Sequence, residues 1–336
     1  MHVIEATNIR DALPLATRYL LEYGVLEKTR VGPAYVAPCP VTIHYKIPKQ
    51  HVLLNPIRDA NPFFHLMEAI WMLAGRDDSA FLDNYIKDFG KKFGKNGTIM
   101  DAYGQRWRRG LRYDQLDQMV IQLRKEPSTR QCVLQMWNAG RDDLMAYSMK
   151  PCNLVATFRI KRGKLDMTVF NRSNDLIWGC CGANAVHFPI LQEYLAARIG
   201  VELGEYWQVS TNLHMYMDHV LMMDKRVPRL ERSLDNYLVD TNEYEHTYPL
   251  IYNAIEFDED LEDTMGWIED IHQGKEIHTG DIVNPFLYDV VIPMAFAHHM
   301  YKVRHWDDAF EALNEVRAED WQRAGREWLT RRQTHG

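Results

Sequence analysis

The chain has 336 residues, of which 46% are hydrophobic and 25% charged, and its formal charge is −7 at pH 7. The length and apolar content are typical of an α/β protein with a full core, whereas the acidic balance argues against direct nucleic-acid binding and favours a small ligand. Five cysteines without a CxxC pair argue against a disulfide framework or a bound metal. The lack of a signal sequence or long apolar run predicts a cytoplasmic protein that binds no membrane.

The first well-marked element is a helix in the stretch NPFFHLMEAIWMLAG. Asn61 can cap it, Pro62 suits its first position and Gly75 can end it. Glu68 lies one turn from Trp71 on the apolar side, where loss of water would raise its pKa towards neutrality, as a general acid or base requires. A helix-edge glutamate that reaches solvent is an equally good alternative.

The alternating runs LVATFRI and LDMTVFNRS, joined by the turn KRGK, predict a β-hairpin over residues 154–173. Cys152 precedes the hairpin and Arg172 lies near its far end, so the hairpin should bring the two residues together at its open end. A lone cysteine is usually an inert buried thiol. A neighbouring cation would lower its pKa and make it a candidate nucleophile.

Two short motifs are candidates for binding a small anionic ligand. Arg172, Ser173 and Asp175 directly follow the second strand, and an arginine beside a serine hydroxyl suits a phosphate. His214 and Tyr216, two residues apart in TNLHMYMDH, share one face if the segment is extended. No third metal ligand accompanies them, so hydrogen bonds to a sugar hydroxyl fit better than zinc.

The rest of the chain shows no repeat or linker, so we expect a single domain over residues 1–336. NAVHFPILQEYLAARIG should form a second buried helix that ends at Gly200, with its first turn kinked or delayed by Pro189. The acid-rich segment 240–275 and the amphipathic tail from residue 303 are expected to be solvated surface.

In their order along the chain these motifs resemble the thymidylate synthase family, from about residue 20 to about residue 225. The most specific matches are PC at Pro151 and Cys152, RSND at 172–175 with Gly179 and Asn184 behind it, and HMY at 214–216. Supporting matches are Arg30 in EKTRVG, EAIWMLAG from Glu68, YGQRWR from Tyr103, and TRQ with Arg130 ahead of WN. The resemblance implies an α/β (α+β) thymidylate synthase fold, in which a large mixed β-sheet packs against helices and mediates a homodimer.

The resemblance also implies a reaction. Cys152 would attack C6 of a pyrimidine nucleoside monophosphate, and C5 would then take a one-carbon unit from the co-substrate 5,10-methylenetetrahydrofolate. The implied substrate contacts are the phosphate with Arg30, Arg172, Ser173 and Arg130 of the partner subunit, and the sugar 3′-hydroxyl with His214 and Tyr216. The implied catalytic groups are Tyr103 for removal of the C5 proton, Glu68 for water and proton traffic, and Asp175 and Asn184 for the polar edge of the base. Folate contacts are implied for Glu68, Asp175 and Gly179.

Departures from the family bear mainly on the last step. Asn153 stands where synthases usually carry histidine, and Gln131 replaces the second arginine of a pair. NYIKDFGKKFGKNGTIMDAYG has no tryptophan before Trp107 to shield the exocyclic methylene, and a divergent helical extension from about residue 285 ends in WLTRRQTHG instead of a hydrophobic lid. Without shield and lid, water can attack the methylene in place of hydride, which is the chemistry of the family's hydroxymethylase branch. WGCCGANAVHF resembles bacteriophage members of that branch, which prepare hypermodified DNA bases in the host cytoplasm.

The choice of base depends on Asn184. Its amide can accept a hydrogen bond from N3–H of uracil and donate one to O4, whereas cytosine reverses both groups. If the loop GCCGAN is one residue longer than in the family, Ala183 faces the base instead and cytosine could bind. We expect 5-hydroxymethyl-dUMP and tetrahydrofolate as products. The alternatives are a dCMP or CMP hydroxymethylase, a reducing thymidylate synthase that makes dTMP, and an inactive nucleotide-binding protein; deoxyribose and ribose are both open.

Overall fold

The computed structural model describes residues 1–55, 58–144, 150–226, 244, 247–251, 256–275 and 283–334, without the side chains of 222–226. The strands are β1 (His2–Ala6), β2 (Val25–Lys28), β3 (Pro33–Val36), β4 (Val41–Tyr45), β5 (Val133–Gln135), β6 (Asn153–Lys161), β7 (Lys164–Asn171), β8 (Asn174–Asp175), β9 (Glu202–Ser210) and β10 (Leu213–Tyr216). The helices of the first half are α1 (Ile9–Tyr23), α2 (Pro62–Leu73), α3 (Ser79–Asp83), α4 (Phe89–Phe93), α5 (Tyr103–Arg108), α6 (Gln115–Lys125) and α7 (Ala139–Asp142). Those of the second half are the π-helix η1 (Leu176–Ala183), α8 (Asn184–Ile199), α9 (Met217–Arg226), α11 (Phe257–His272), the π-helix η2 (Leu287–Val291), α12 (Ile292–Lys302), α13 (Trp306–Asn314) and α14 (Glu319–Gln333).

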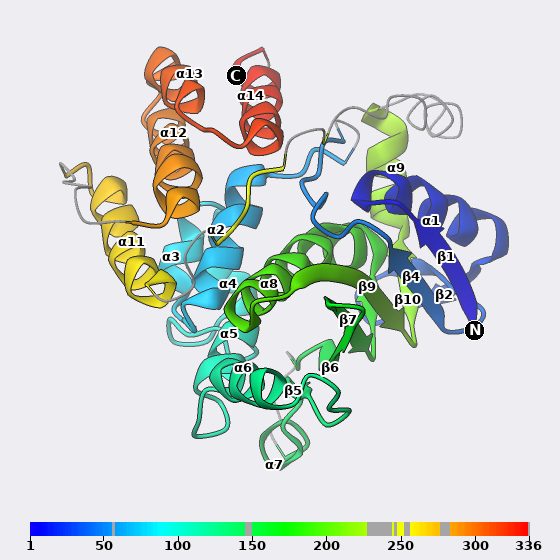
Figure 1. Ribbon diagram of the computed structural model, residues 1–336. Helices are drawn as coiled ribbons and strands as arrows, with labels where there is room; N and C mark the ends of the chain where they lie inside the picture. The colour runs from blue at the N-terminus through cyan, green and yellow to red at the C-terminus, as the bar shows by residue number, and fades with distance from the viewer. Residues whose placement is uncertain are drawn as a thin grey trace.

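A six-stranded mixed β-sheet with strand order β1-β4-β9-β7-β6-β5 organises the fold (Figure 1). β1 pairs parallel with β4 and β7 parallel with β9, whereas the other neighbours are antiparallel. The chain passes from β7 to β9 through α8, the kind of crossover that a parallel pair requires. A smaller sheet follows the order β2-β3-β10-β8. The large mixed sheet with its covering helices confirms the predicted fold class.

The predicted hairpin forms the centre of this sheet. β6 and β7 pair antiparallel from Asn153↔Asn171 to Lys161↔Lys164. Arg162 and Gly163 make the two-residue turn, with φ of 54° and 76°, the left-handed backbone that a type I′ hairpin turn needs. The turn therefore fixes the pairing that returns the chain to the start of β6.

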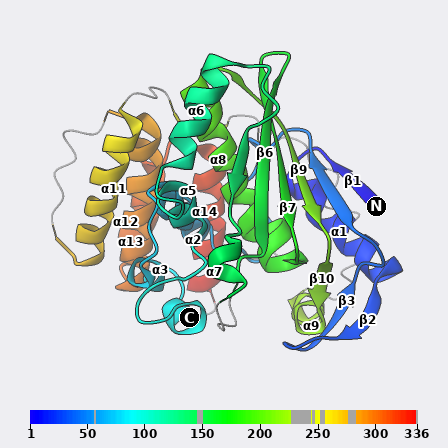
Figure 2. The same ribbon diagram turned by 90° about the horizontal axis from the view of Figure 1, so that it is seen from below.

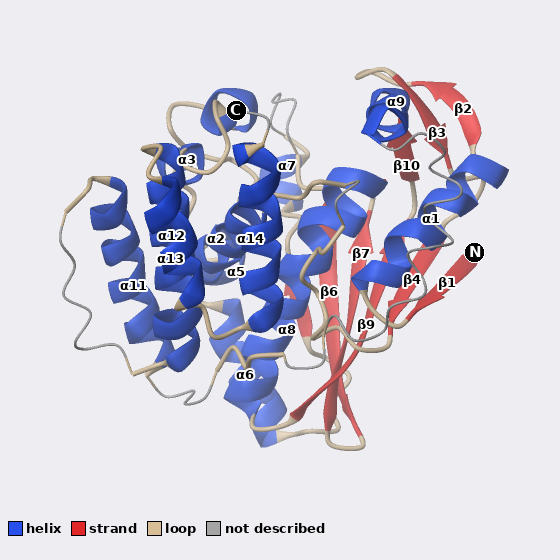
Figure 3. Ribbon diagram, turned by 90° about the horizontal axis from the view of Figure 1, so that it is seen from above, coloured by secondary structure: helices blue, strands red, loops and turns tan. Residues whose placement is uncertain are grey.

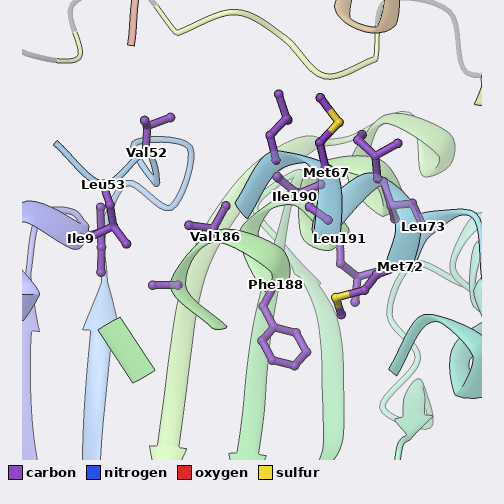
Figure 4. Packing of buried hydrophobic residues seen from close by; sticks show 14 of the residues in the cluster. Ile9, Val52, Leu53, Met67, Met72, Leu73, Val186, Phe188, Ile190 and Leu191 are labelled. Atoms are coloured by element: carbon purple, nitrogen blue, oxygen red, sulfur yellow. The ribbon is translucent and has the colours of Figure 1, made fainter. Parts of the chain in front are cut away.

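α2 is the central buried helix and packs on α8. Its N-cap is Asn61, whose side chain accepts from the backbone N–H of Phe64, and Gly75 follows its end with φ of 68°, as predicted. Figure 4 shows Met67 beside Ile190 of α8. Side chains of this size each contribute about 1.5–3 kcal/mol when fully buried. Of the twelve residues of α2, all except Glu68 are buried.

α8 forms as predicted and ends at Gly200, whose φ is 88°. The predicted delay of its first turn is wrong, because the helix already begins at Asn184, ahead of Pro189. The irregular backbone lies upstream instead, inside η1, where Cys181 and Gly182 have non-helical φ and ψ. α8 can continue through Pro189 because the ring removes a single backbone donor near its start.

The acid-rich segment is not simply solvated surface, which corrects that expectation for its described part. α11 buries an apolar stripe that includes Phe257, Leu261 and Ile268. On the same helix, the Asp258 carboxylate accepts hydrogen bonds from Arg108 at 2.9 Å and from the Tyr194 hydroxyl. Helical spacing brings apolar residues to one face even where most neighbours are acids. Residues 240–243, 245–246 and 252–255 of the segment lie outside the described residues.

The tail is likewise part of the packed structure, contrary to expectation. Trp328 of α14 is buried, and its ring lies 5.4 Å from that of Phe63 at the start of α2. Arg331 and Arg332 form ion pairs at 3.0 Å with Asp59, just ahead of α2. Figures 1 and 3 show α12 and α14 next to α2, on the side away from the sheet. Across the described ranges, every helix is too short or too polar to cross a bilayer.

Candidate active site

Cys152 lies at the open end of the β6–β7 hairpin. The backbone N–H of Arg172 donates to the Cys152 carbonyl at 3.0 Å, and its Nη2 lies 3.8 Å from the Cys152 Sγ. The same guanidinium donates to the carbonyls of Pro151 at 2.9 Å and Lys150 at 2.8 Å. The hairpin therefore brings Cys152 and Arg172 together, as the sequence predicts. Figure 2 shows that α7, β10 and α9 lie at the same end of the molecule.

The surroundings of the thiol set its acidity. Burial raises the pKa of Cys152 above its ordinary value, and the Arg172 guanidinium opposes that rise. Asp101 and Asp175 raise the pKa further. Since burial is the largest of these effects, the free thiol keeps its proton near neutral pH. Nucleophilic attack therefore requires that the proton leave as the carbon–sulfur bond forms.

Tyr103, at the start of α5, is held directly against the backbone of Cys152. Its hydroxyl oxygen accepts from the backbone N–H of Cys152 at 3.0 Å and of Asn153 at 3.2 Å. Burial raises the pKa of Tyr103 far above its ordinary value, so the phenol stays neutral. Both lone pairs of the Tyr103 oxygen accept hydrogen bonds, so the hydroxyl hydrogen can be donated to a third group. A residue that carries a proton at this site would need such a hydrogen.

Glu68 projects from α2 as a carboxyl group kept from water. Its side chain is only 16% exposed, and within the described part of the chain its Oε2 has no hydrogen-bond partner. Burial, assisted by the charge of Asp101, raises the pKa of Glu68 to about 8. A carboxyl that is protonated at neutral pH has the property that a general acid needs. The low exposure of the side chain shows that the alternative of a solvent-exposed helix-edge glutamate is wrong.

His187 of α8 completes the surroundings of Glu68. Its Nε2 lies 3.4 Å from the Glu68 Oε2, yet burial lowers the pKa of His187 to about 3. The two side chains therefore form a neutral pair at pH 7 and not an ion pair. Sequence reasoning missed both His187 and Asp101, because neither belongs to a local pattern that indicates a buried polar contact.

Four buried amide side chains form one hydrogen-bonded cluster: those of Asn153, Asn174, Asn184 and Gln208. Asn153 and Asn184 exchange two hydrogen bonds, from Asn153 Nδ2 to Asn184 Oδ1 at 3.2 Å and from Asn184 Nδ2 to Asn153 Oδ1 at 3.3 Å. The Asn184 Nδ2 also lies 3.2 Å from the Asn174 Oδ1 and 3.4 Å from the Gln208 Oε1. Asn184 thus adjoins the residue that follows Cys152, whereas Ala183 ends η1. Sequence reasoning assigned no role to Asn174 within the RSND motif, and it missed Gln208, which has no local pattern that indicates a buried polar contact.

The groups predicted to hold sugar and phosphate gather on the small sheet. His214 pairs in register with Asp175, and its ring lies 5.0 Å from that of Tyr216. Tyr216 is hydrogen-bonded to Thr29 and is close enough to the exposed Arg30 for the arginine's charge to act on its pKa. Ser173, half-buried, lies between Arg172 and β8.

Arg130 lies apart from this group. It is exposed and lines a hollow on the face of the large sheet, together with Arg159, Trp207 and Val209. None of the other predicted site residues lines that hollow. Within one chain, Arg130 is therefore not assembled with Cys152.

Trp178, an exposed aromatic side chain, lies in the chain between Asp175 and Gly179. The Asp175 carboxylate caps η1 by accepting from the backbone N–H of Trp178 at 3.2 Å. Trp178 is 50% exposed, its Nε1 donates to His219 at 2.6 Å, and Arg58 lies 4.4 Å from its ring centroid. One ring face is thus supported by a cation while the indole remains accessible, which suits stacking of a flat ligand.

Among the described residues, no three histidine, cysteine or acidic side chains cluster as they would to hold a metal.

The chain is similar to proteins of one family. The family model described as "Thymidylate synthase" matches residues 15–259. A Pseudomonas phage M6 protein named deoxyuridylate hydroxymethyltransferase is 39% identical over 99% of this chain and 95% of its own length. A Bacillus phage SP01 protein of the same name is 39% identical over 53% of this chain and 50% of its own. A thymidylate synthase of Buchnera aphidicola subsp. Schizaphis graminum is 28% identical over 51% of this chain and 66% of its own.

Proposed function

This chain belongs to the thymidylate synthase family, and we propose that it hydroxymethylates C5 of dUMP. The reaction consumes 5,10-methylenetetrahydrofolate and water and yields 5-hydroxymethyl-dUMP and tetrahydrofolate. The observation that carries the proposal is the thiol of Cys152 beside Arg172, with Asn184 next to the residue that follows the nucleophile. Similarity over nearly the whole chain to a protein named deoxyuridylate hydroxymethyltransferase supports the same reaction.

Each proposed role follows from the position of its group. Cys152 forms a bond from sulfur to C6, which makes C5 the nucleophile that takes the one-carbon unit. Tyr103, neutral and directly on the Cys152 backbone, assists loss of the C5 proton. As this proton leaves, the bond between the one-carbon unit and the folate nitrogen breaks, which releases tetrahydrofolate and leaves an exocyclic methylene on C5. Water then adds to the methylene carbon, and the sulfur–C6 bond breaks as the C5–C6 double bond returns. No electrons are gained or lost, so the folate product is tetrahydrofolate.

The features around Glu68 favour completion by water. Its carboxyl keeps a proton at neutral pH, and Oε2 makes no hydrogen bond within the described part of the protein although His187 lies 3.4 Å away, so it can hold and orient a water molecule. α14, whose arginines pair with Asp59, packs as a fixed helix against α2 instead of lying as an extended strap. Both features suit a site that admits a water molecule and orients it, in contrast to a site that closes and excludes water.

For the co-substrate, we propose a folate site at Asp175, Trp178 and Gly179. The half-exposed indole offers a face for the flat pterin or aminobenzoyl ring. Gly179 allows the backbone next to the indole to approach Asn174 closely, because a Cβ at this position would come within 2.8 Å of the Asn174 Oδ1. For the nucleotide, we propose that Arg30, Arg172 and Ser173 hold the phosphate, while His214 and Tyr216 hold the 3′-hydroxyl.

We further propose one catalytic domain that functions as a homodimer formed through the large sheet. The face that carries Arg130 also carries exposed apolar residues at Val3, Val133 and Phe170, which are 48%, 42% and 38% exposed. An exposed apolar sheet face favours association with a second copy. In that arrangement, Arg130 of each subunit contacts the phosphate that is bound in the site of the other subunit.

Mixing two inactive variants tests the shared site. We expect Arg130→Ala and Cys152→Ala to be nearly inactive alone, and random re-association of their subunits to restore about a quarter of the wild-type sites. The hybrid contains one complete site, with Cys152 from one subunit and Arg130 from the other. Co-purification of an untagged variant with a tagged one is the control for exchange of subunits, and absence of recovered activity from subunits that do exchange would contradict the proposal.

Product analysis tests the reaction itself. With dUMP, methylenetetrahydrofolate and ¹⁸O-labelled water, we expect hydroxymethyl-dUMP that carries the label, with tetrahydrofolate and no dihydrofolate. Formation of dTMP with dihydrofolate would establish a reducing synthase instead. Product from dCMP alone would change the assigned base. Failure of every pyrimidine nucleotide to exchange its C5 hydrogen would favour the inactive nucleotide-binding protein.

A further inference from the structure

The direction in which the Asn184 amide points decides which base it can pair with. An asparagine side chain has an accepting oxygen and a donating nitrogen, and a rotation of half a turn exchanges them. Uracil presents a donor at N3, whereas cytosine presents an acceptor there. If the protein hydroxymethylates dUMP as proposed, something must keep the Asn184 oxygen on the accepting side.

The structure contains a fixed reference for that direction at Gln208. This side chain is fully buried in β9, and its Nε2 lies 3.0 Å from the carbonyl oxygen of Cys180 in η1. A backbone carbonyl can only accept, so Gln208 must turn its nitrogen towards Cys180. Its oxygen, Oε1, therefore points the other way and is available as an acceptor.

Asn174 of β8 transmits this direction. One of its terminal atoms lies 2.7 Å from the Gln208 Oε1, so that atom must be the donating Nδ2. The same nitrogen also donates to the Ser210 hydroxyl at 3.0 Å. The Asn174 oxygen consequently faces Asn184.

Asn184 then has one permitted direction. Besides the Asn153 Oδ1, its nitrogen faces two acceptors of the buried cluster, the Asn174 Oδ1 at 3.2 Å and the Gln208 Oε1 at 3.4 Å. The reverse rotation would bring three oxygens together with no proton between them, at the cost of buried unpaired acceptors. The Asn184 Oδ1 accepts from Asn153 Nδ2 at 3.2 Å, and no other described residue donates to it. One of its lone pairs remains for a ligand.

We propose that Gln208 and Asn174 are positioning residues that determine base specificity. With Asn184 they form an amide relay, anchored on the Cys180 carbonyl, that presents Asn184 as an acceptor to N3–H of uracil and opposes N3 of cytosine. This inference rests on the proposed function. It also changes one expected detail: both hydrogens of Asn184 Nδ2 are engaged by Asn153 and the relay, so the donor for O4 must come from another group.

Variants that interrupt the relay without touching Asn184 test the proposal. Asn174→Leu removes the acceptor that orients Asn184, and Gln208→Met removes the reference at Cys180. For each variant, kcat/KM and Kd are measured with dUMP and with dCMP. We expect the preference for dUMP over dCMP to fall about tenfold or more, because Asn184 becomes free to rotate.

Ser210→Ala is the matched control. It removes a hydrogen bond from the same buried cluster, but a hydroxyl can donate or accept and so sets no direction. We expect Ser210→Ala to lose thermal stability comparable to the relay variants while its base preference stays unchanged. Equal preference in wild type, Gln208→Met and Asn174→Leu would overturn the proposal, and if one variant does not fold the other decides.

The two measurements keep the proposals separate. A wild type that makes hydroxymethyl-dUMP, with relay variants of unchanged preference, contradicts the relay and leaves the function standing. A wild type without turnover whose Kd preference nevertheless falls in the variants contradicts the function and leaves the relay standing.

Discussion

Replacing Cys152 with alanine is expected to lower kcat by about 10⁴-fold or more, because removal of a covalent nucleophile leaves only binding and electrostatics to act on the base. Release of tritium from C5 of dUMP is the direct measurement, since exchange of that hydrogen requires the bond from sulfur to C6. The Kd for dUMP should change only a few-fold, because the proposed phosphate and sugar contacts lie on Arg30, Arg172, His214 and Tyr216.

Two variants sharpen this test. Cys39→Ala removes another incompletely buried thiol, one that lies 3.8 Å from the Tyr19 hydroxyl, and should leave turnover near wild type. Arg172→Gln removes the cation that opposes the raised pKa of Cys152, so alkylation of this thiol at pH 8 should become slower. Turnover by Cys152→Ala within tenfold of wild type would rule out covalent attack by this residue.

Glu68→Gln is expected to lower kcat by about 10²- to 10³-fold, the usual effect of removing a general acid or base. The pKa of Glu68 is raised to about 8, so the wild-type carboxyl carries its proton at neutral pH and loses it above that value. If the protonated form is the active one, kcat/KM of the wild type declines above pH 8. The glutamine variant should lack this decline, because it has no group to titrate there. A wild-type profile that is flat through pH 8 to 9 would exclude Glu68 as the acid.

The same shift predicts how stability depends on pH. Below the ordinary pKa of 4.5 the carboxyl is protonated in both folded and unfolded chains, so it has no effect. Between 4.5 and about 8 the unfolded chain ionises while the folded one resists, and the free energy of unfolding falls. At about 1.4 kcal/mol per pKa unit, the wild type should lose a few kcal/mol relative to Glu68→Gln as pH rises through this window. Denaturant unfolding of both proteins at pH 5 and pH 8.5 measures the difference.

Local sequence was sufficient for elements whose geometry is set by neighbours along the chain. The turn KRGK fixes β6 against β7, and that pairing alone places Arg172 beside Cys152. Asn61 and Gly75 mark the ends of α2, and the spacing of apolar residues within it correctly places Glu68 away from water. In each case the relevant partners lie within one helix or one hairpin.

Sequence was insufficient where segments far apart in the chain meet. Asp101 acts on both Glu68 and Cys152 only because α2 and the residues ahead of α5 converge in space. Gln208 touches Cys180 and Asn174 through the packing of β9 against η1 and β8. α11 was expected at the surface because its charges dominate its composition, while its buried stripe becomes evident only against its neighbours.

The covering of α2 by the tail has a consequence for biosynthesis. The ring of Phe63 packs against His298 of α12 at 5.2 Å and against Trp328 of α14 at 5.4 Å. On the ribosome, the side of α2 that α12 and α14 cover therefore remains open to solvent until residues beyond 328 have emerged. The helix that carries Glu68 reaches its final environment only after the rest of the site has been synthesised, so nascent chains should need protection from aggregation during that interval.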